Sequence, residues 1–164
     1  MSSSTHQINV LIGQVHVARP PDRLYTVVGS CIAVVLFDPN AHVAGMAHVL
    51  LPDSRGGASN GLPGKYADQA VPALLDALIA FGARRTNLKA MFAGGGAFHD
   101  QLVQGEPMGE RNVKAIRKAL AGQAIEAVTT DTGGRHGRRV WFDPNTGELQ
   151  IEKLKDYQDG TRVA

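Results

Sequence analysis

The sequence predicts a layered α/β (α+β) sandwich of mostly antiparallel strands with two main helices. Short apolar segments recur between turn signals, two longer segments have helical periodicity, and glycine is abundant, at 19 of 164 residues. Hydrophobic residues make up 43% of the chain and charged residues 20%, which is typical of a globular domain with a buried core. Few helices among many strands favour this layered class over a helix bundle.

The chain has the length of one domain. We expect that domain to span 8–155, between a mobile N-terminal tail at 1–7 and a C-terminal tail at 156–164. The first residues lack the basic and apolar regions of a signal peptide, and no apolar run approaches the ~18 residues of a membrane span. We therefore expect no direct membrane insertion.

Composition excludes several classes of function. The formal net charge of +2 is too small to require a nucleic acid partner. The single cysteine, Cys31, excludes an internal disulfide framework and a cysteine-rich zinc site, and it favours a reducing, cytoplasmic setting. No pair of histidines has the helical spacing of a metal site, so we expect no metal site.

The strands are predicted from short apolar or β-branched segments bounded by glycine, proline and asparagine. The run at 32–37 is apolar without alternation, so a strand there would be buried on both faces. Pro39 and Asn40 then signal a turn that pairs this strand with the next. Strands are expected at 8–12, 14–18, 24–28, 32–37, 43–51, 88–93, 124–130, 138–142 and 148–154.

Two helices are predicted from apolar residues at i, i+3, i+4 and i+7 spacing. The first spans 67–81, and the second runs from about Glu110 to Gly122, where glycine ends it. The triple glycine 94–96 after a strand lacks the lysine of a phosphate loop, so we interpret it as a structural turn. The basic cluster at 135–139 is interpreted as a solvated turn.

Geometry gives Cys31 a possible role beyond packing. A lone cysteine is most often a small buried hydrophobe. If the strands at 32–37 and 43–49 pair across a tight turn at Pro39 and Asn40, Cys31 lies opposite His48, on the same face. A one-residue slip would send His48 to the other face.

A thiol beside an imidazole is the arrangement that a cysteine nucleophile needs. The imidazole accepts the thiol proton and later gives it to a leaving amine. Backbone N–H groups around Gly29, Ser30 and Cys31 would stabilise an oxyanion. The Thr26 hydroxyl would orient His48, although the pattern alone favours the interpretation of Thr26 as an ordinary β-branched strand residue. The mechanism requires proton-transfer reach between the two side chains and a path from the sulfur to solvent.

Several segments resemble the chemoreceptor glutamine deamidase family, CheD. These are Thr26-Val-Val-Gly-Ser-Cys31-Ile-Ala-Val-Val-Leu-Phe-Asp38, Gly45-Met-Ala-His48-Val-Leu-Leu-Pro52, Lys65-Tyr66-Ala-Asp68, Gly94-Gly95-Gly96-Ala97-Phe98, Gly109-Glu-Arg111-Asn112, Asp131-Thr-Gly133-Gly134 and Gly137-Arg138. The resemblance covers nearly the whole chain, and the order of several separate motifs makes it specific. A lone Gly-Ser-Cys would carry little weight.

The resemblance implies a CheD-like layered fold without a metal or organic cofactor. It implies hydrolysis of particular glutamine side chains to glutamate on methyl-accepting chemotaxis receptors, with Cys31, His48 and Thr26 as the catalytic residues. Some members of the family also bind a CheC-type phosphatase, which is therefore a possible second partner. The family's threonine often stands one residue further from the cysteine than Thr26 does.

Some interpretations remain open at this stage. Gly45 and Ala47 leave room for a substrate side chain, or they allow close packing between strands. The glycine-rich segment at 53–64 contacts the receptor, or it is an idle loop. Arg111 and Asn112, at a helix start, help form the site or, in the default interpretation, cap the helix and pair locally. The alternative function is a non-enzymatic chemotaxis adaptor that keeps the fold and binds a phosphatase or receptor.

Overall fold

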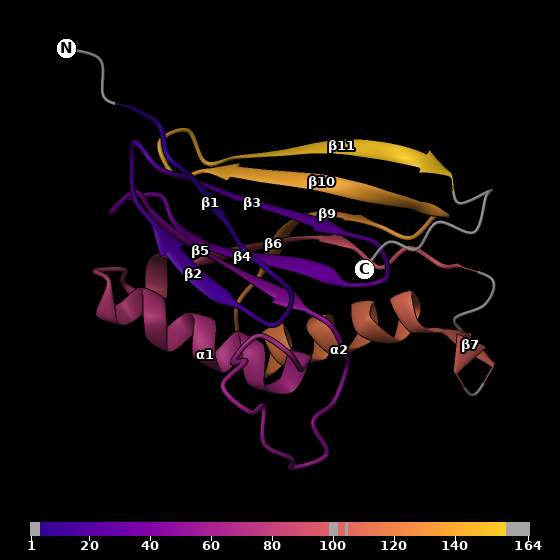
Figure 1. Ribbon diagram of the computed structural model, residues 1–164. Helices are drawn as coiled ribbons and strands as arrows, with labels where there is room; N and C mark the ends of the chain where they lie inside the picture. The colour runs from indigo at the N-terminus through magenta and orange to yellow at the C-terminus, as the bar shows by residue number, and fades with distance from the viewer. Residues whose placement is uncertain (1–3, 99–101, 104, 157–164) are drawn as a thin grey trace.

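The computed structural model describes residues 4–98, 102–103 and 105–156. It has three layers, which confirms the predicted α+β sandwich (Figure 1). The top layer is a four-stranded sheet in the order β1 (Gln7–Asn9), β3 (Arg23–Val28), β10 (His136–Asp143) and β11 (Glu148–Asp156). The middle layer is a five-stranded sheet in the order β2 (Val15–Ala18), β5 (Val43–Val49), β4 (Ile32–Asp38), β6 (Lys89–Gly94) and β9 (Ala127–Thr132).

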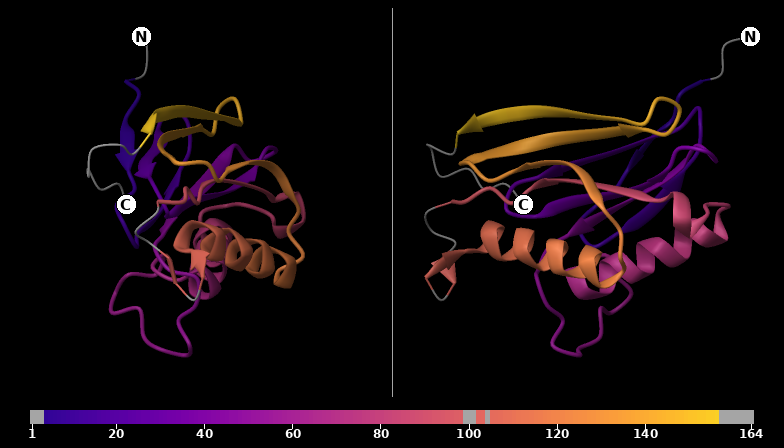
Figure 2. Two further views of the ribbon diagram at one scale, coloured as in Figure 1. Left: turned by 90° about the vertical axis from the view of Figure 1, so that its right-hand side faces the viewer. Right: turned by 180° about the vertical axis from the view of Figure 1, so that it is seen from behind.

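The third layer consists of helices α1 (Ala67–Ala80) and α2 (Met108–Gly122), which cover the outer face of the five-stranded sheet (Figure 2). Strand pairing is antiparallel except for β1 with β3 and β6 with β9. Three short elements were not predicted from the sequence. They are the 3-10 helix η1 (Arg85–Asn87) and the small hairpin of β7 (Leu102–Val103) and β8 (Glu106–Pro107).

Strand β4 is buried along its whole length because it lies between two layers. Its side chains alternate between two apolar clusters. Ile32, Val34 and Leu36 belong to the cluster under the helices, whereas Ala33 and Val35 belong to the cluster between the sheets. The unbroken apolar run therefore reflects burial on both faces, as predicted.

The helices pack as their periodicity predicts. In α1 the buried face includes Val71, Leu74 and Leu78, which pack against the five-stranded sheet. Helix α2 begins at Met108, directly after Pro107 and two residues before the expected start. Because of this early start, Gly109 packs directly against the triple glycine at 94–96. A Cβ added to Gly109 would lie 2.3 Å from the carbonyl oxygen of Gly96.

The β4–β5 hairpin forms as predicted, but the assumed register was wrong by two residues. Ala33, not Cys31, lies opposite His48, and Asp38 lies opposite Val43. The connection between β4 and β5 is longer than the tight turn expected at Pro39 and Asn40. It is longer because the Asp38 carboxylate accepts hydrogen bonds from the N–H groups of Asn40 and Ala41, at 2.9 and 3.0 Å. A shift of two residues keeps every side chain on its expected face.

At the ends of the domain, the sheet begins at Gln7, which pairs with Arg23. The carbonyl of His6 also accepts a hydrogen bond from the Arg23 N–H group, so the end of the expected tail at 1–7 is bonded to the sheet. Of the expected tail at 156–164, residue 156 ends β11, and 157–164 lie outside the described residues. No helix in the described part of the chain is long and apolar enough to cross a membrane.

Candidate active site

Three neighbouring elements carry the predicted catalytic side chains. Thr26 lies on β3 of the four-stranded sheet, His48 lies on β5 of the five-stranded sheet, and Cys31 lies in the turn that joins β3 to β4. Burial alternates along β3, so that Thr26 points inward, toward the other sheet. Cys31 belongs to the apolar cluster between the two sheets, so the three residues share one interlayer space.

Thr26 and His48 form a direct hydrogen bond across this space. The Thr26 Oγ1 atom lies 2.7 Å from His48 Nδ1 and 2.6 Å from the carbonyl oxygen of Val10. A carbonyl oxygen can only accept, so the hydroxyl proton goes to Val10, and Nδ1–H of His48 donates to Thr26. This arrangement leaves Nε2 as the unprotonated nitrogen of the neutral ring.

The free nitrogen of His48 is buried. Nε2 has no hydrogen-bond partner among the described residues, so the predicted direct contact with Cys31 is not formed. The observed register explains this result, because it makes Cys31 a diagonal neighbour of His48, at about 7–8 Å between Cα atoms in a regular sheet. His48 borders a pocket of about 210 Å³, which is lined by Asn9, Val10, Leu11, Ile12, Tyr25, Thr26, Val27 and His48.

The sulfur of Cys31 has no access to solvent, which departs from what the mechanism requires. The residue is 0% exposed, and its thiol is free. Burial raises the pKa of the Cys31 thiol to about 12, because the thiolate would lose its hydration. Burial also lowers the pKa of His48 to about 4, partly offset by a backbone hydrogen bond at Val10. The substrate-free site is therefore closed, with a neutral thiol and a neutral imidazole.

The turn before β4 has its carbonyl groups anchored. The carbonyls of Gly29 and Cys31 accept hydrogen bonds from the N–H groups of Gly96 and Gly95, at 2.9 and 3.0 Å. The carbonyl of Ser30 accepts from the side chain of Asn112, at 2.9 Å. Among the described residues, no acceptor meets the N–H groups of Ser30 and Cys31. These groups remain available for the predicted oxyanion role.

The triple glycine forms the other wall of this turn, as a structural turn and not as a phosphate loop. Gly94 and Gly95 have positive φ, +126° and +67°. An added Cβ on Gly94 would lie 2.1 Å from the carbonyl oxygen of Cys31, and one on Gly95 would lie 2.5 Å from Val113. Only glycine allows the backbone to come this close to the turn that carries the cysteine.

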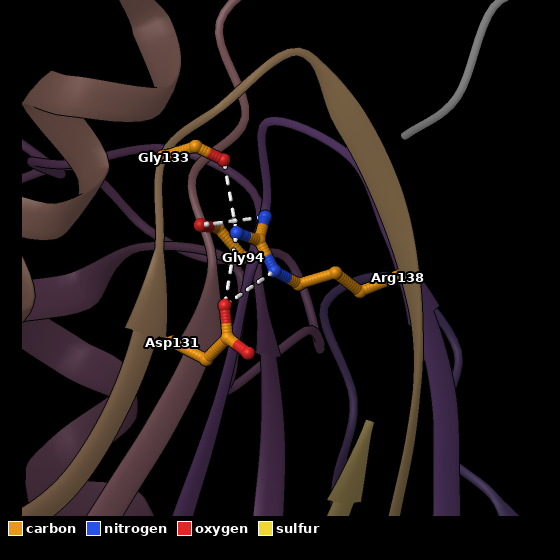
Figure 3. A network of polar contacts seen from close by, with 4 residues as sticks. All are labelled: Gly94, Asp131, Gly133 and Arg138. Atoms are coloured by element: carbon orange, nitrogen blue, oxygen red, sulfur yellow. Dashed lines mark hydrogen bonds and ion pairs between the residues drawn. The ribbon is translucent and has the colours of Figure 1, made fainter. Parts of the chain in front are cut away.

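A buried arginine supports the triple glycine (Figure 3). Arg138 is 1% exposed; its guanidinium contacts one carboxylate oxygen of Asp131, at 3.1 and 3.2 Å. It also donates to the carbonyls of Gly94 and Gly133 (Figure 3). The interpretation of the basic cluster as a solvated turn was wrong for Arg138, because β10 turns this side chain inward while Arg139 remains exposed.

Gly45 and Ala47 do not line the predicted pocket. They alternate with His48 along β5 and therefore face the helices. Ala47 belongs to the cluster under the helices, and an added Cβ on Gly45 would lie 2.6 Å from Leu74 Cδ1. Their small size serves close packing against α1, which was the alternative interpretation.

The default interpretation of Asn112, a helix cap, was wrong. Asn112 lies within α2, is fully buried, and donates to the carbonyls of Ser30 and Leu50, at 2.9 and 3.1 Å. The sequence signal that could have revealed this role is the position of Asn112, a polar residue on the same helix face as Ile116 and Leu120. The described residues contain no cluster of three or more metal-binding side chains.

Comparisons with known proteins show the family to which this chain belongs. The family model described as CheD chemotactic sensory transduction matches residues 50–153. The chain is 41% identical to the chemoreceptor glutamine deamidase CheD of Thermotoga maritima, over 87% of this chain and 89% of the relative. It is 40% identical to the protein of the same name from Bacillus licheniformis, over 94% of this chain and 95% of the relative. It is 38% identical to a probable chemoreceptor glutamine deamidase CheD of Methanococcus vannielii, over 89% of this chain and 94% of the relative.

The fold and the site define a layered α+β domain in which a threonine holds a histidine close to the turn that carries a buried cysteine. The chain belongs to the CheD family.

Proposed function

We propose that this protein hydrolyses the side-chain amide of specific glutamines on methyl-accepting chemotaxis receptors and converts them to glutamate. The names of its relatives, chemoreceptor glutamine deamidases, support this substrate and reaction. The observation that carries the proposal is the Thr26–His48 hydrogen bond, because it leaves Nε2 of His48 free to act as a base.

The proposed reaction uses Cys31 as the nucleophile. Sγ attacks the amide carbon of the substrate glutamine while its proton passes to Nε2 of His48. The carbonyl π electrons move to oxygen, and the N–H groups of Ser30 and Cys31 stabilise that oxyanion. The C–N bond then breaks as His48 protonates the leaving nitrogen, which releases ammonia and leaves a thioester on Cys31.

Water completes the reaction. His48 takes a proton from the water as its oxygen attacks the thioester carbon, and the C–S bond breaks. The released sulfur regains its proton from His48, and the product is a glutamate side chain. One water is consumed and one ammonia released, so the chemistry requires no metal or organic cofactor.

Receptor binding must open the closed site. Two exposed apolar side chains, Leu11 and Ile12, border the His48 pocket. The glycine-rich segment at 53–64 ends beside them, because the N–H group of Gly64 donates to the carbonyl of Gly13, at 2.8 Å. We infer that this segment contacts the helical cytoplasmic region of the receptor, so that the protein acts in the cytoplasm. A CheC-type phosphatase is a possible second partner.

The alternative function, a non-enzymatic adaptor, has one observation in its favour. Cys31 is fully buried, and an adaptor would tolerate a sulfur that no substrate reaches. The same adaptor has no need for a buried imidazole whose Nε2 lacks a partner in the described part of the chain, since an unpaired buried nitrogen costs stability. This cost favours the enzyme.

One experiment separates the two functions. The full chain is incubated with the cytoplasmic fragment of a chemoreceptor, and glutamine-to-glutamate conversion is mapped by peptide mass spectrometry. We expect conversion at particular glutamines by the wild type and none by His48→Gln. Binding of the fragment without conversion by the wild type would establish the adaptor instead.

A further inference from the structure

Asn112 lies where helix α2 meets the turn that carries Cys31. Its two amide hydrogens go to two backbone carbonyls, that of Ser30 in the turn between β3 and β4 and that of Leu50 directly after β5. Because both partners can only accept, the amide nitrogen must face them, and Oδ1 remains buried without a partner among the described residues. A fully buried side chain with one unpaired oxygen costs stability, and helix packing alone gives no reason to keep it.

The Ser30 carbonyl belongs to the same peptide group as the N–H of Cys31. A trans peptide is planar, so its C=O and N–H bonds point in opposite directions. The group that holds the carbonyl of Ser30 therefore also sets the direction of the Cys31 N–H group. The preceding peptide is fixed in the same way, because the Gly96 N–H group holds the carbonyl of Gly29.

We propose that Asn112 is a positioning residue that fixes the Ser30–Cys31 peptide plane, and so pre-orients the Cys31 N–H group as an oxyanion donor. This inference rests on the proposed function and extends it. Of the hydrogen bonds that hold the turn at Gly29, Ser30 and Cys31, this one comes from a side chain, and it is therefore open to substitution.

The contact with Leu50 adds a second constraint. Leu50 follows β5, two residues after His48, and its own N–H group donates to the carbonyl of Lys65, at 3.0 Å. One amide nitrogen thus joins the turn that carries the nucleophile to the end of the strand that carries the base. Pre-organised donors of this kind act on the transition state more than on substrate binding, so their loss lowers kcat.

The test compares Asn112→Leu with a matched control on the same helix. Leucine keeps the approximate size but donates no hydrogen bond. Ile116→Ala is the control, because Ile116 lies one turn later, is also fully buried, and belongs to the cluster under the helices. Deamidation of a receptor cytoplasmic fragment is followed at several substrate concentrations. The slow alkylation of Cys31 by iodoacetamide, which reaches the buried sulfur only through transient opening of the structure, is followed without substrate.

We expect Asn112→Leu to lower kcat about 10- to 100-fold, to change KM by less than about 3-fold, and not to slow alkylation. Ile116→Ala should lose thermal stability and keep kcat within about 3-fold of the wild type. Asn112→Ser, whose hydroxyl can reach at most one of the carbonyls, should keep more activity than Asn112→Leu. It also serves as the test variant if Asn112→Leu does not fold.

Three results would overturn the inference. These are an unchanged kcat in both Asn112 variants, a loss that appears only in KM, and a slowing of alkylation in proportion to kcat, which would mean that the nucleophile itself is lost. A crystal structure of the variant decides the matter without activity, because the inference expects the Ser30 carbonyl to leave its present direction. If the wild type converts no glutamine, the proposed function fails, and the crystal structure still tests the peptide orientation.

Discussion

Nδ1 of His48 donates a hydrogen bond to the hydroxyl of Thr26, 2.7 Å away, and the hydroxyl in turn donates to the carbonyl of Val10. This relay fixes both the tautomer and the ring plane of His48, with no charged residue in the third position. In a serine or cysteine triad that position is often held by a carboxylate or an amide. A threonine gives orientation without adding negative charge.

Removal of the Thr26 hydroxyl should therefore lower catalysis without removing the base. We expect Thr26→Val to reduce kcat for receptor deamidation about 10- to 100-fold, because the Nδ1–H group loses its acceptor and the tautomer is no longer fixed. Thr26→Ser keeps the hydroxyl and should retain most of the activity. Nitrogen NMR of the imidazole reports the tautomer directly. Equal activity in Thr26→Val and the wild type would show that the hydrogen bond has no catalytic role.

The buried imidazole should make the protein less stable in acid. The pKa of His48 is lowered from 6.5 to about 4 by burial, so the unfolded chain takes up a proton before the folded protein does. His48 therefore does not change the free energy of unfolding with pH above pH 6.5. As the pH falls from 6.5 toward 4, preferential protonation of the unfolded chain lowers the free energy of unfolding by about 3 kcal/mol. Urea unfolding at several pH values should show this additional loss in the wild type and not in His48→Gln. Parallel pH curves for the two proteins would contradict the buried neutral state.

Arg138 should matter for stability far more than its neighbour Arg139. Replacing Arg138 with methionine leaves Asp131 without its cation and the carbonyl of Gly133 without its donor, and we expect a loss of about 2–3 kcal/mol of unfolding free energy. Arg139→Met changes an exposed side chain and serves as the control, with no change expected. Denaturant unfolding measures both. Similar effects of the two substitutions would mean that the buried network does not hold the triple glycine.

Gly45→Ala distinguishes packing from substrate binding. The added methyl group would lie 2.6 Å from Leu74 Cδ1 and 3.3 Å from Leu78, so we expect a loss of about 1–3 kcal/mol of stability. Because Gly45 faces away from His48, kcat and KM should be nearly unchanged in the folded fraction. Gly122→Ala, at the end of α2 with open space around it, is the matched control. A large change in KM for Gly45→Ala would show instead that Gly45 lines the substrate pocket.

Local sequence patterns predicted the layers and both helices because each depends on periodicity within one segment. The apolar run at β4 predicted burial on both faces, and the apolar spacing in α1 predicted its buried face. The hairpin register was missed because the Asp38 carboxylate lengthens the connection, a local contact that outweighs the tight-turn preference of proline and asparagine.

Long-range polar contacts were beyond the reach of sequence patterns. Arg138 was assigned to a solvated cluster, since the charges around it gave no sign that β10 turns this one side chain toward Asp131. Asn112 bridges Ser30 and Leu50, which are 82 and 62 residues away along the chain. The Thr26–His48 contact, by contrast, was predicted, because both residues stand in motifs that suggested a shared role.

The most direct measurement is the intermediate on Cys31. Wild-type protein is mixed with a receptor cytoplasmic fragment, quenched in acid during turnover, and digested for mass spectrometry. The account predicts a peptide containing Cys31 joined to a receptor glutamyl group through a thioester, with no such adduct and no conversion in Cys31→Ala. Glutamine conversion by Cys31→Ala at the wild-type rate would contradict the proposed mechanism.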